Sequence, residues 1–146
     1  MRALILPAIS LFLTLFASCS KSYTITSGKL QIEINHNLET KITSLYSGTK
    51  PLMDHYVASE YLECKKFEAK LFSQKSAFSE PFSDVRGGGM RRVFKGIFKQ
   101  DEYSIEKILE ISVYDSFPDM AFYRLQYVNI GERDIEVKKW VNNSYR

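Results

Sequence analysis

Residues 105–145 read IEKILEISVYDSFPDMAFYRLQYVNIGERDIEVKKWVNNSY, and this stretch decides the fold of the chain. Ile105, Leu109 and Ile111 alternate with polar residues, and this period of two predicts a half-buried strand. Pro118 then removes a backbone donor and fixes its own φ, so the strand ends at the corner that contains it.

Two more strands are predicted beyond this corner. The first runs from Met120 to Asn129, and its partly apolar second face indicates that both faces are covered. A third strand begins around Val137, after a turn at Gly131. Val137 and Trp140 are three positions apart, so a β-bulge near Lys138–Lys139 is needed if both are to face one core. The three strands predict an antiparallel meander that needs a second layer to cover it.

The rest of the chain also favours β-structure. Strands are predicted over Tyr23–Ile25, Leu30–Ile34, Lys41–Tyr46, Glu60–Lys65, Glu68–Ser73 and Arg91–Lys99. Ser73 to Gly89 is interpreted as a long polar loop that ends in a flexible turn at Gly87–Gly89. About eight to ten short strands without a helix after the N-terminus predict an all-β antiparallel sandwich, in one domain over residues 19–146.

The N-terminus has the pattern of an export signal. An apolar run from Ala3 to Phe16 is too short to span a membrane and has the length of a signal-peptide core. Small residues before Cys19 favour a bacterial lipoprotein signal over residues 1–18, with Cys19 lipidated and the protein anchored to the cell envelope, in the outer membrane or the periplasm. Phe16 departs from the aliphatic residue usual at that position, and the alternative is an ordinary secretory signal cut near Ala17. If Cys19 is acylated, Cys64 has no partner for a disulfide.

Charge and composition exclude some functions. The formal net charge is +3, and removal of residues 1–18 takes Arg2 away and leaves about +2. So weak a balance gives no support to nucleic-acid binding.

Few residues are candidates for chemistry. Asp115 and Asp119 flank the proline corner and could form a glycosidase pair, but both are expected to be turn residues that accept backbone hydrogen bonds. His36 and His55 lack the spacing of metal ligands, so neither a metal nor another cofactor is expected. No catalytic residue is predicted.

Two further segments have simple interpretations. Gly87–Gly89 lacks the lysine and the helix of a phosphate loop and is interpreted as a turn. Arg91, Arg92, Lys95 and Lys99 surround Phe94 and Phe98, which could make a basic aromatic patch. The preferred interpretation is a solvated strand edge, because charged residues there discourage edge-to-edge pairing.

One cluster is a candidate for carbohydrate binding. Trp140 stands close to Asn142, Asn143 and Tyr145 in the sequence. A flat indole suits the apolar face of a sugar ring, and amides suit its hydroxyls. The preferred interpretation is nevertheless a core tryptophan at the bulge, followed by a polar loop.

Three runs also resemble a known family: Val113–Arg124 with its Tyr-Asp-x-Phe-Pro corner, Tyr127–Gly131 with x-Asn-x-Gly, and Lys139–Asn143. Together they resemble the N-terminal β-sandwich of family 36 glycoside hydrolases, the α-galactosidase group. The resemblance implies a supersandwich of the galactose-mutarotase kind that precedes a catalytic barrel. It also implies that the catalytic aspartates lie on that barrel, so that this chain is a fragment without hydrolytic activity and an α-galactoside or other glycan binds through the barrel.

Two main hypotheses follow. The chain is the non-catalytic N-terminal domain of an exported α-galactosidase-like hydrolase, or it is a small surface lipoprotein that binds glycan or a partner protein without catalysis. A sugar epimerase of similar topology is a weaker third option, since no His and Glu acid/base pair can be assigned to His36 or His55. The sequence does not predict an oligomeric state.

Overall fold

The computed structural model describes residues 22–46 and 50–145 of the chain. The predicted signal sequence and Cys19 lie outside these residues. The described part contains strands, turns and bends but no helix, and thus no helix that could cross a membrane. Its strands are β1 (Tyr23–Ser27), β2 (Leu30–Ile34), β3 (Thr40–Ser44), β4 (Lys50–Pro51), β5 (Tyr61–Cys64), β6 (Glu68–Ala69), β7 (Ser73–Asp84), β8 (Gly87–Gln100), β9 (Tyr103–Tyr114), β10 (Phe122–Asn129) and β11 (Val137–Val141).

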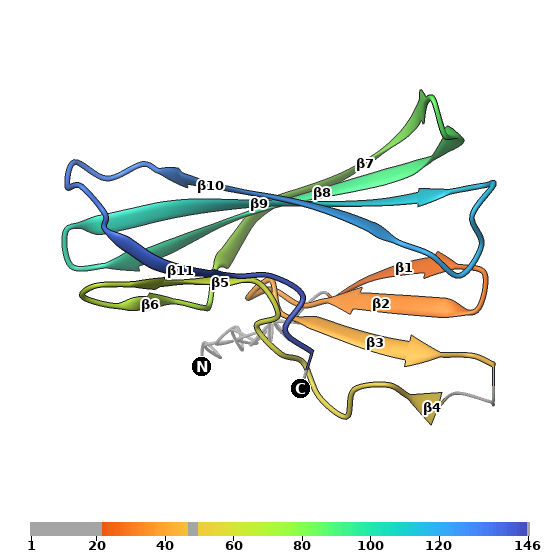
Figure 1. The fold of residues 1–146 in the computed structure, drawn as a ribbon, viewed down its shortest axis with the longest axis horizontal. Coiled ribbons are helices and arrows are strands. Elements are labelled where there is room, and N and C mark those ends of the chain that lie inside the picture. Colours follow the sequence, from red (N-terminus) through yellow and green to blue (C-terminus); the bar gives the residue numbers. More distant parts are fainter. Residues whose placement is uncertain (1–21, 47–49, 146) are drawn as a thin grey trace, which may run out of the picture.

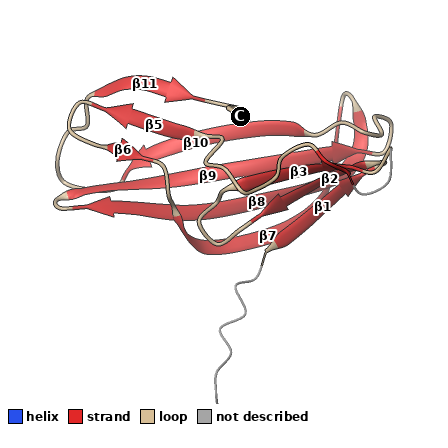
Figure 2. Ribbon diagram, turned by 90° about the horizontal axis from the view of Figure 1, so that it is seen from below, coloured by secondary structure: helices blue, strands red, loops and turns tan. Residues whose placement is uncertain are grey.

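These strands form three antiparallel sheets in two layers. The large sheet has the order β10-β9-β8-β7, and the smaller sheets have the orders β1-β2-β3-β4 and β11-β5-β6. The two small sheets lie beside each other and cover opposite halves of one face of the large sheet (Figures 1 and 2). The predicted all-β sandwich is therefore confirmed.

The first hairpin forms as the sequence pattern predicts. Ile25 pairs with Ile32 in the β1–β2 ladder, and both are buried. Gly28 has a φ of +54° at the turn, a conformation that costs glycine little.

The β9–β10 pair is also confirmed. Ile105, Leu109 and Ile111 are all buried on the inner side of β9. The chain turns at the Pro118 corner and returns as β10, with Leu125 paired opposite Leu109. β9 ends at Tyr114 and β10 begins at Phe122, so the corner lies within a few residues of the break predicted between Asp115 and Asp119.

The meander prediction is wrong for the third strand. β11 pairs with β5 instead of β10, so the chain crosses from one layer to the other after β10. The predicted bulge is present, because the register shifts between Val137 and Lys139. The shift places Val137 opposite Cys64 and Trp140 opposite Leu62, and both partners are buried.

The predicted loop from Ser73 to Gly89 is also wrong, because most of it is strand. β7 and β8 form one long hairpin that extends beyond the rest of the sandwich (Figure 1). Pro81 is tolerated in β7 because this strand lies at the edge of its sheet, where a missing donor breaks no ladder. Gly87–Gly89 is the first part of β8 and not a flexible turn. Conversely, β6 is shorter than predicted and ends at Ala69.

One core is shared by the three sheets. Its buried residues include Ile32 and Ile34 from the first small sheet, Leu62 from the second, and Phe94 and Leu109 from the large sheet. The core therefore joins segments that are far apart in the sequence.

Candidate functional site

The predicted sugar-binding residues lie on β11 and the segment that follows it. Trp140 is 54 % exposed, although it pairs with the buried Leu62, because β11 is an edge strand that leaves one side of the indole uncovered. The indole packs edge to face against Tyr127 of β10, with ring centroids 5.2 Å apart and planes at 73°. The preferred interpretation of a core tryptophan is therefore wrong.

The structure brings all four predicted residues to one open hollow. Residues 139–145 line it, and its volume is about 420 Å³. Asn142 and Asn143 are exposed, and Asn143 has a φ of 53°, a conformation that asparagine adopts more readily than most residues. The Tyr145 hydroxyl donates a hydrogen bond to Asn143 Oδ1 at 3.1 Å, and the Tyr145 side chain forms part of the hollow.

An ion pair is buried next to this hollow. Lys107 of β9 and Glu60, just before β5, are both 0 % exposed. Lys107 Nζ lies 3.4 Å from Glu60 Oε2 and also donates to the backbone carbonyls of Glu60 at 2.8 Å and Leu38 at 3.5 Å. These three acceptors surround the ammonium group within the core.

Burial lowers the pKa of Lys107, and the carboxylate of Glu60 opposes that effect. The sequence pattern already contained this signal. Lys107 falls between Ile105 and Leu109 on the inward side of the strand, where a lysine needs a buried partner. No sequence pattern pointed to Glu60, because the residues around it follow neither the strand period nor the helical period.

Three tyrosines face this ion pair. The hydroxyl of Tyr145 lies near Ser59, Glu60 and Tyr123, and burial together with the Glu60 carboxylate raises the pKa of Tyr145 to about 12. Burial and then the neighbouring Tyr145 raise the pKa of Tyr123, and burial and the Glu60 carboxylate raise the pKa of Tyr127. We call Ser59, Glu60, Lys107, Tyr123, Tyr127 and Tyr145 the Glu60 cluster.

Several polar atoms of the Glu60 cluster have no hydrogen-bond partner among the described residues. They are Ser59 Oγ, Glu60 Oε1, Tyr123 Oη and Tyr127 Oη, each shielded from solvent; the Tyr145 hydroxyl lies beside Ser59, Glu60 and Tyr123 without a hydrogen bond of good geometry to any of these four atoms. Such atoms are rare in folded proteins because each one left unsatisfied costs about 1–3 kcal/mol.

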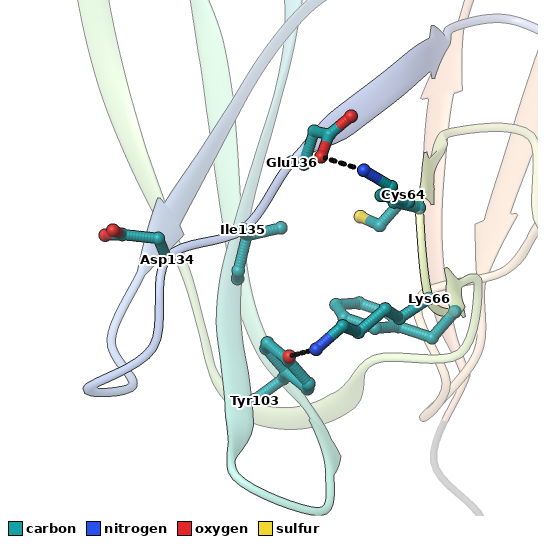
Figure 3. A pocket seen from close by; sticks show the side chains of 8 residues that line it. Cys64, Lys66, Tyr103, Asp134, Ile135 and Glu136 are labelled. Carbon is teal, nitrogen blue, oxygen red and sulfur yellow. Dashed lines mark hydrogen bonds and ion pairs between the residues drawn. The ribbon is translucent and has the colours of Figure 1, made fainter.

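A second hollow lies between the β5–β6 turn and the segment before β11 (Figure 3). Its volume is about 220 Å³, and both lysines that line it have polar partners. Lys65 Nζ lies 3.0 Å from Glu136 Oε2, and Lys66 Nζ donates to the Tyr103 hydroxyl at 2.9 Å. Burial raises the pKa of the Cys64 thiol at this hollow, so the reactive thiolate form is disfavoured.

The other sequence candidates lie apart from the Glu60 cluster. Asp119 accepts hydrogen bonds from the Lys29 backbone N–H and the Tyr46 hydroxyl, so its carboxylate joins the proline corner to the first hairpin. The Tyr46 hydrogen bond, followed by that of Lys29, lowers the pKa of Asp119. Asp115 is exposed, as are His36 and His55. Within residues 22–46 and 50–145, no three His, Cys, Asp or Glu side chains are grouped as metal ligands would be.

The basic segment does not lie on a strand edge, because β8 is an interior strand between β7 and β9. Phe94 is fully buried on its inner side, whereas Arg91 alternates with it and pairs with Glu110 at 3.2 Å and Glu80 at 3.6 Å. The alternation of the strand therefore places Phe94 and Arg91 on opposite faces, and Arg91 lies instead over the Phe82 ring of β7, 4.8 Å from its centroid.

Comparison with protein families, with curated proteins and with solved structures finds no match to this chain. Its function must therefore be argued from its own residues and their geometry.

Proposed function

We propose that this chain is a non-catalytic carbohydrate-binding β-sandwich, the N-terminal domain of an exported glycoside hydrolase of the α-galactosidase kind. The half-exposed indole of Trp140 beside Asn142 and Asn143 is the observation that carries the proposal. The N-terminal pattern around Cys19 supports export and a lipid anchor in the cell envelope.

The chemistry of the hollow suits a neutral sugar. One edge of the indole is held against Tyr127, and the exposed remainder offers an apolar platform for the C–H face of a pyranose. The amides of Asn142 and Asn143 can each donate to and accept from ring hydroxyls. The hollow is shallow, which fits a binding surface better than an enclosed catalytic pocket.

The acidic residues of the corner also support a non-catalytic role. Asp119 is bound to the first hairpin, and a carboxylate that holds two strands together is poorly placed to act as a nucleophile. In the resembled family the reacting carboxylates belong to the barrel, and a binding domain needs none of its own.

The second candidate is a small surface lipoprotein that binds glycan without any catalytic partner. The shared core favours it, because the large sheet is covered by both small sheets and its central side chains are fully buried. Both candidates use the same Trp140 hollow. The presence or absence of a barrel with paired carboxylates in the downstream reading frame distinguishes them.

Replacement of Trp140 tests the binding surface itself. We expect Trp140→Ala to weaken retention on immobilised α-galactosides and related glycans at least about tenfold, because the stacking platform is removed. Retention is measured by affinity chromatography, and thermal unfolding followed by far-UV circular dichroism verifies the fold.

Phe78→Ala is the matched control, since Phe78 is a similarly exposed aromatic residue on the distant strand β7. This variant should be retained like the wild type. Full retention of the Trp140→Ala variant would show that the hollow is not the binding surface.

A further inference from the structure

The Glu60 cluster lies directly behind the Trp140 hollow. Tyr127 belongs to both, because its ring contacts the Trp140 indole while its hydroxyl points to the buried side near Glu60. Tyr145 also belongs to both, since it lines the hollow and lies beside Ser59, Glu60 and Tyr123. The exposed platform and the buried polar groups are therefore contiguous.

The arrangement of Glu60 leaves one oxygen available. The Lys107 ammonium donates hydrogen bonds to Glu60 Oε2 and to the Glu60 backbone carbonyl, whereas Glu60 Oε1 accepts none of good geometry from the described residues. The hydroxyl of Tyr127 is likewise without a partner in the described part of the chain, whereas that of Tyr123 lies beside the Tyr145 hydroxyl. A strand that needed only packing at these positions would be served as well by phenylalanine, without the cost of buried hydroxyls.

These groups define the chemistry of a fitting ligand. A carboxylate oxygen accepts a hydrogen bond from a hydroxyl, and a tyrosine hydroxyl can donate or accept. The Glu60 carboxylate would repel an anion, and the Lys107 ammonium would repel a cation. The set therefore suits a neutral molecule with several hydroxyl groups.

We propose that the Glu60 cluster is the inner part of the carbohydrate site, where Glu60 Oε1 and the hydroxyls of Tyr123 and Tyr127 bind the hydroxyl edge of a neutral pyranose stacked on Trp140. This inference rests on the proposed function and extends it from a surface platform to a site with specific hydrogen bonds.

The segment after β11 controls entry to the Glu60 cluster. It is held over the cluster by the Tyr145 side chain and by one backbone hydrogen bond, from Ser144 N to Ser59 O at 2.9 Å. Displacement of this short segment breaks no sheet ladder, because β11 ends at Val141. A sugar edge can therefore replace Tyr145 beside Ser59 and Glu60 without unfolding a strand.

Two conservative variants test the inner site. Tyr123→Phe and Tyr127→Phe each remove one hydroxyl and keep the ring, so we expect each to weaken binding of methyl α-galactopyranoside about tenfold, measured by isothermal titration calorimetry of the purified protein. The urea midpoint of Tyr127→Phe should equal or exceed that of the wild type, because the Tyr127 hydroxyl has no hydrogen-bond partner among the described residues.

Tyr103→Phe is the control, since the Tyr103 hydroxyl accepts its hydrogen bond from Lys66 at the other hollow. It should bind the methyl galactoside like the wild type.

The possible outcomes separate this inference from the proposed function. Wild-type affinity in both tyrosine variants, together with lost binding in Trp140→Ala, would overturn the inner site and leave the surface platform. A lower urea midpoint with unchanged affinity would assign the hydroxyls to the fold and also overturn it. Failure of the wild type to bind methyl α-galactopyranoside, methyl α-glucopyranoside or methyl α-mannopyranoside would overturn both proposals.

Discussion

At the scale of single residues, the most costly feature of the molecule is the buried ion pair. Transfer of Lys107 and Glu60 from water to the core is unfavourable, and only close hydrogen bonds offset this cost. Loss of one partner is therefore far more damaging than the presence of the pair is stabilising. The pair differs in this from Lys65 and Glu136, whose charges remain largely in solvent.

Replacement of Lys107 measures how much stability is lost when one partner of the buried pair is removed. We expect Lys107→Met to lower the free energy of unfolding by about 3–5 kcal/mol, because it leaves Glu60 buried without a counter-charge. The double variant Lys107→Met with Glu60→Met should recover part of this loss, since no unpaired charge remains. Urea titration followed by far-UV circular dichroism provides both values.

Lys65→Met is the matched control for an exposed pair. It should cost less than about 1 kcal/mol. Equal losses for the Lys65 and Lys107 variants would mean that Lys107 is not a buried partner of Glu60.

At the scale of elements, β8 depends on the absence of a side chain at Gly96. A Cβ atom there would lie 2.7 Å from Leu38 Cδ1 and 2.9 Å from the Phe72 carbonyl oxygen. Gly96 thus lets Leu38 of the β2–β3 connection and Phe72, just before β7, approach β8 closely. Gly88 in the same strand has no comparable contact, because a Cβ atom there would be 3.7 Å from its nearest neighbour.

We expect Gly96→Ala to destabilise the protein by about 1–3 kcal/mol, because the Phe72 backbone must move to admit the methyl group. Gly88→Ala should change stability little, and its urea midpoint is the reference. A Gly96→Ala variant as stable as Gly88→Ala would show that the Leu38 and Phe72 segments do not pack closely on β8.

Element prediction succeeded where periodicity and turn chemistry agreed. The alternation before the Pro118 corner and the spacing of Val137 and Trp140 were sufficient to predict β9, β10 and the bulge of β11. The β7 strand was missed because its residues are mostly exposed at the edge of the sheet and show little alternation.

At the scale of the whole molecule, stability comes from one core to which all three sheets contribute. Phe94 in the large sheet and Leu62 in the β11-β5-β6 sheet belong to the same buried cluster. If one sheet separates from the core, the apolar side chains of the sheet it covered become exposed to water. The sheets should therefore unfold together.

The only tryptophan, Trp140, reports on this coupling. We expect Phe94→Ala to lower the free energy of unfolding by about 3–5 kcal/mol and to shift two signals equally, Trp140 fluorescence and far-UV circular dichroism. A fluorescence midpoint that stayed in place while the circular dichroism midpoint fell would show that the β11-β5-β6 sheet unfolds separately.

Local sequence patterns were enough to predict the all-β class, the first hairpin, the Pro118 corner and the bulge, because each depends on side-chain alternation or on the backbone limits of glycine and proline. It also brought Trp140, Asn142, Asn143 and Tyr145 together as neighbours in the chain. Only the tertiary structure decided that β11 pairs with β5, that β7 is a strand, and that Glu60 meets Lys107. These contacts join segments that are distant in the sequence, and local patterns hold no information about which distant partner satisfies a buried charge or a free strand edge.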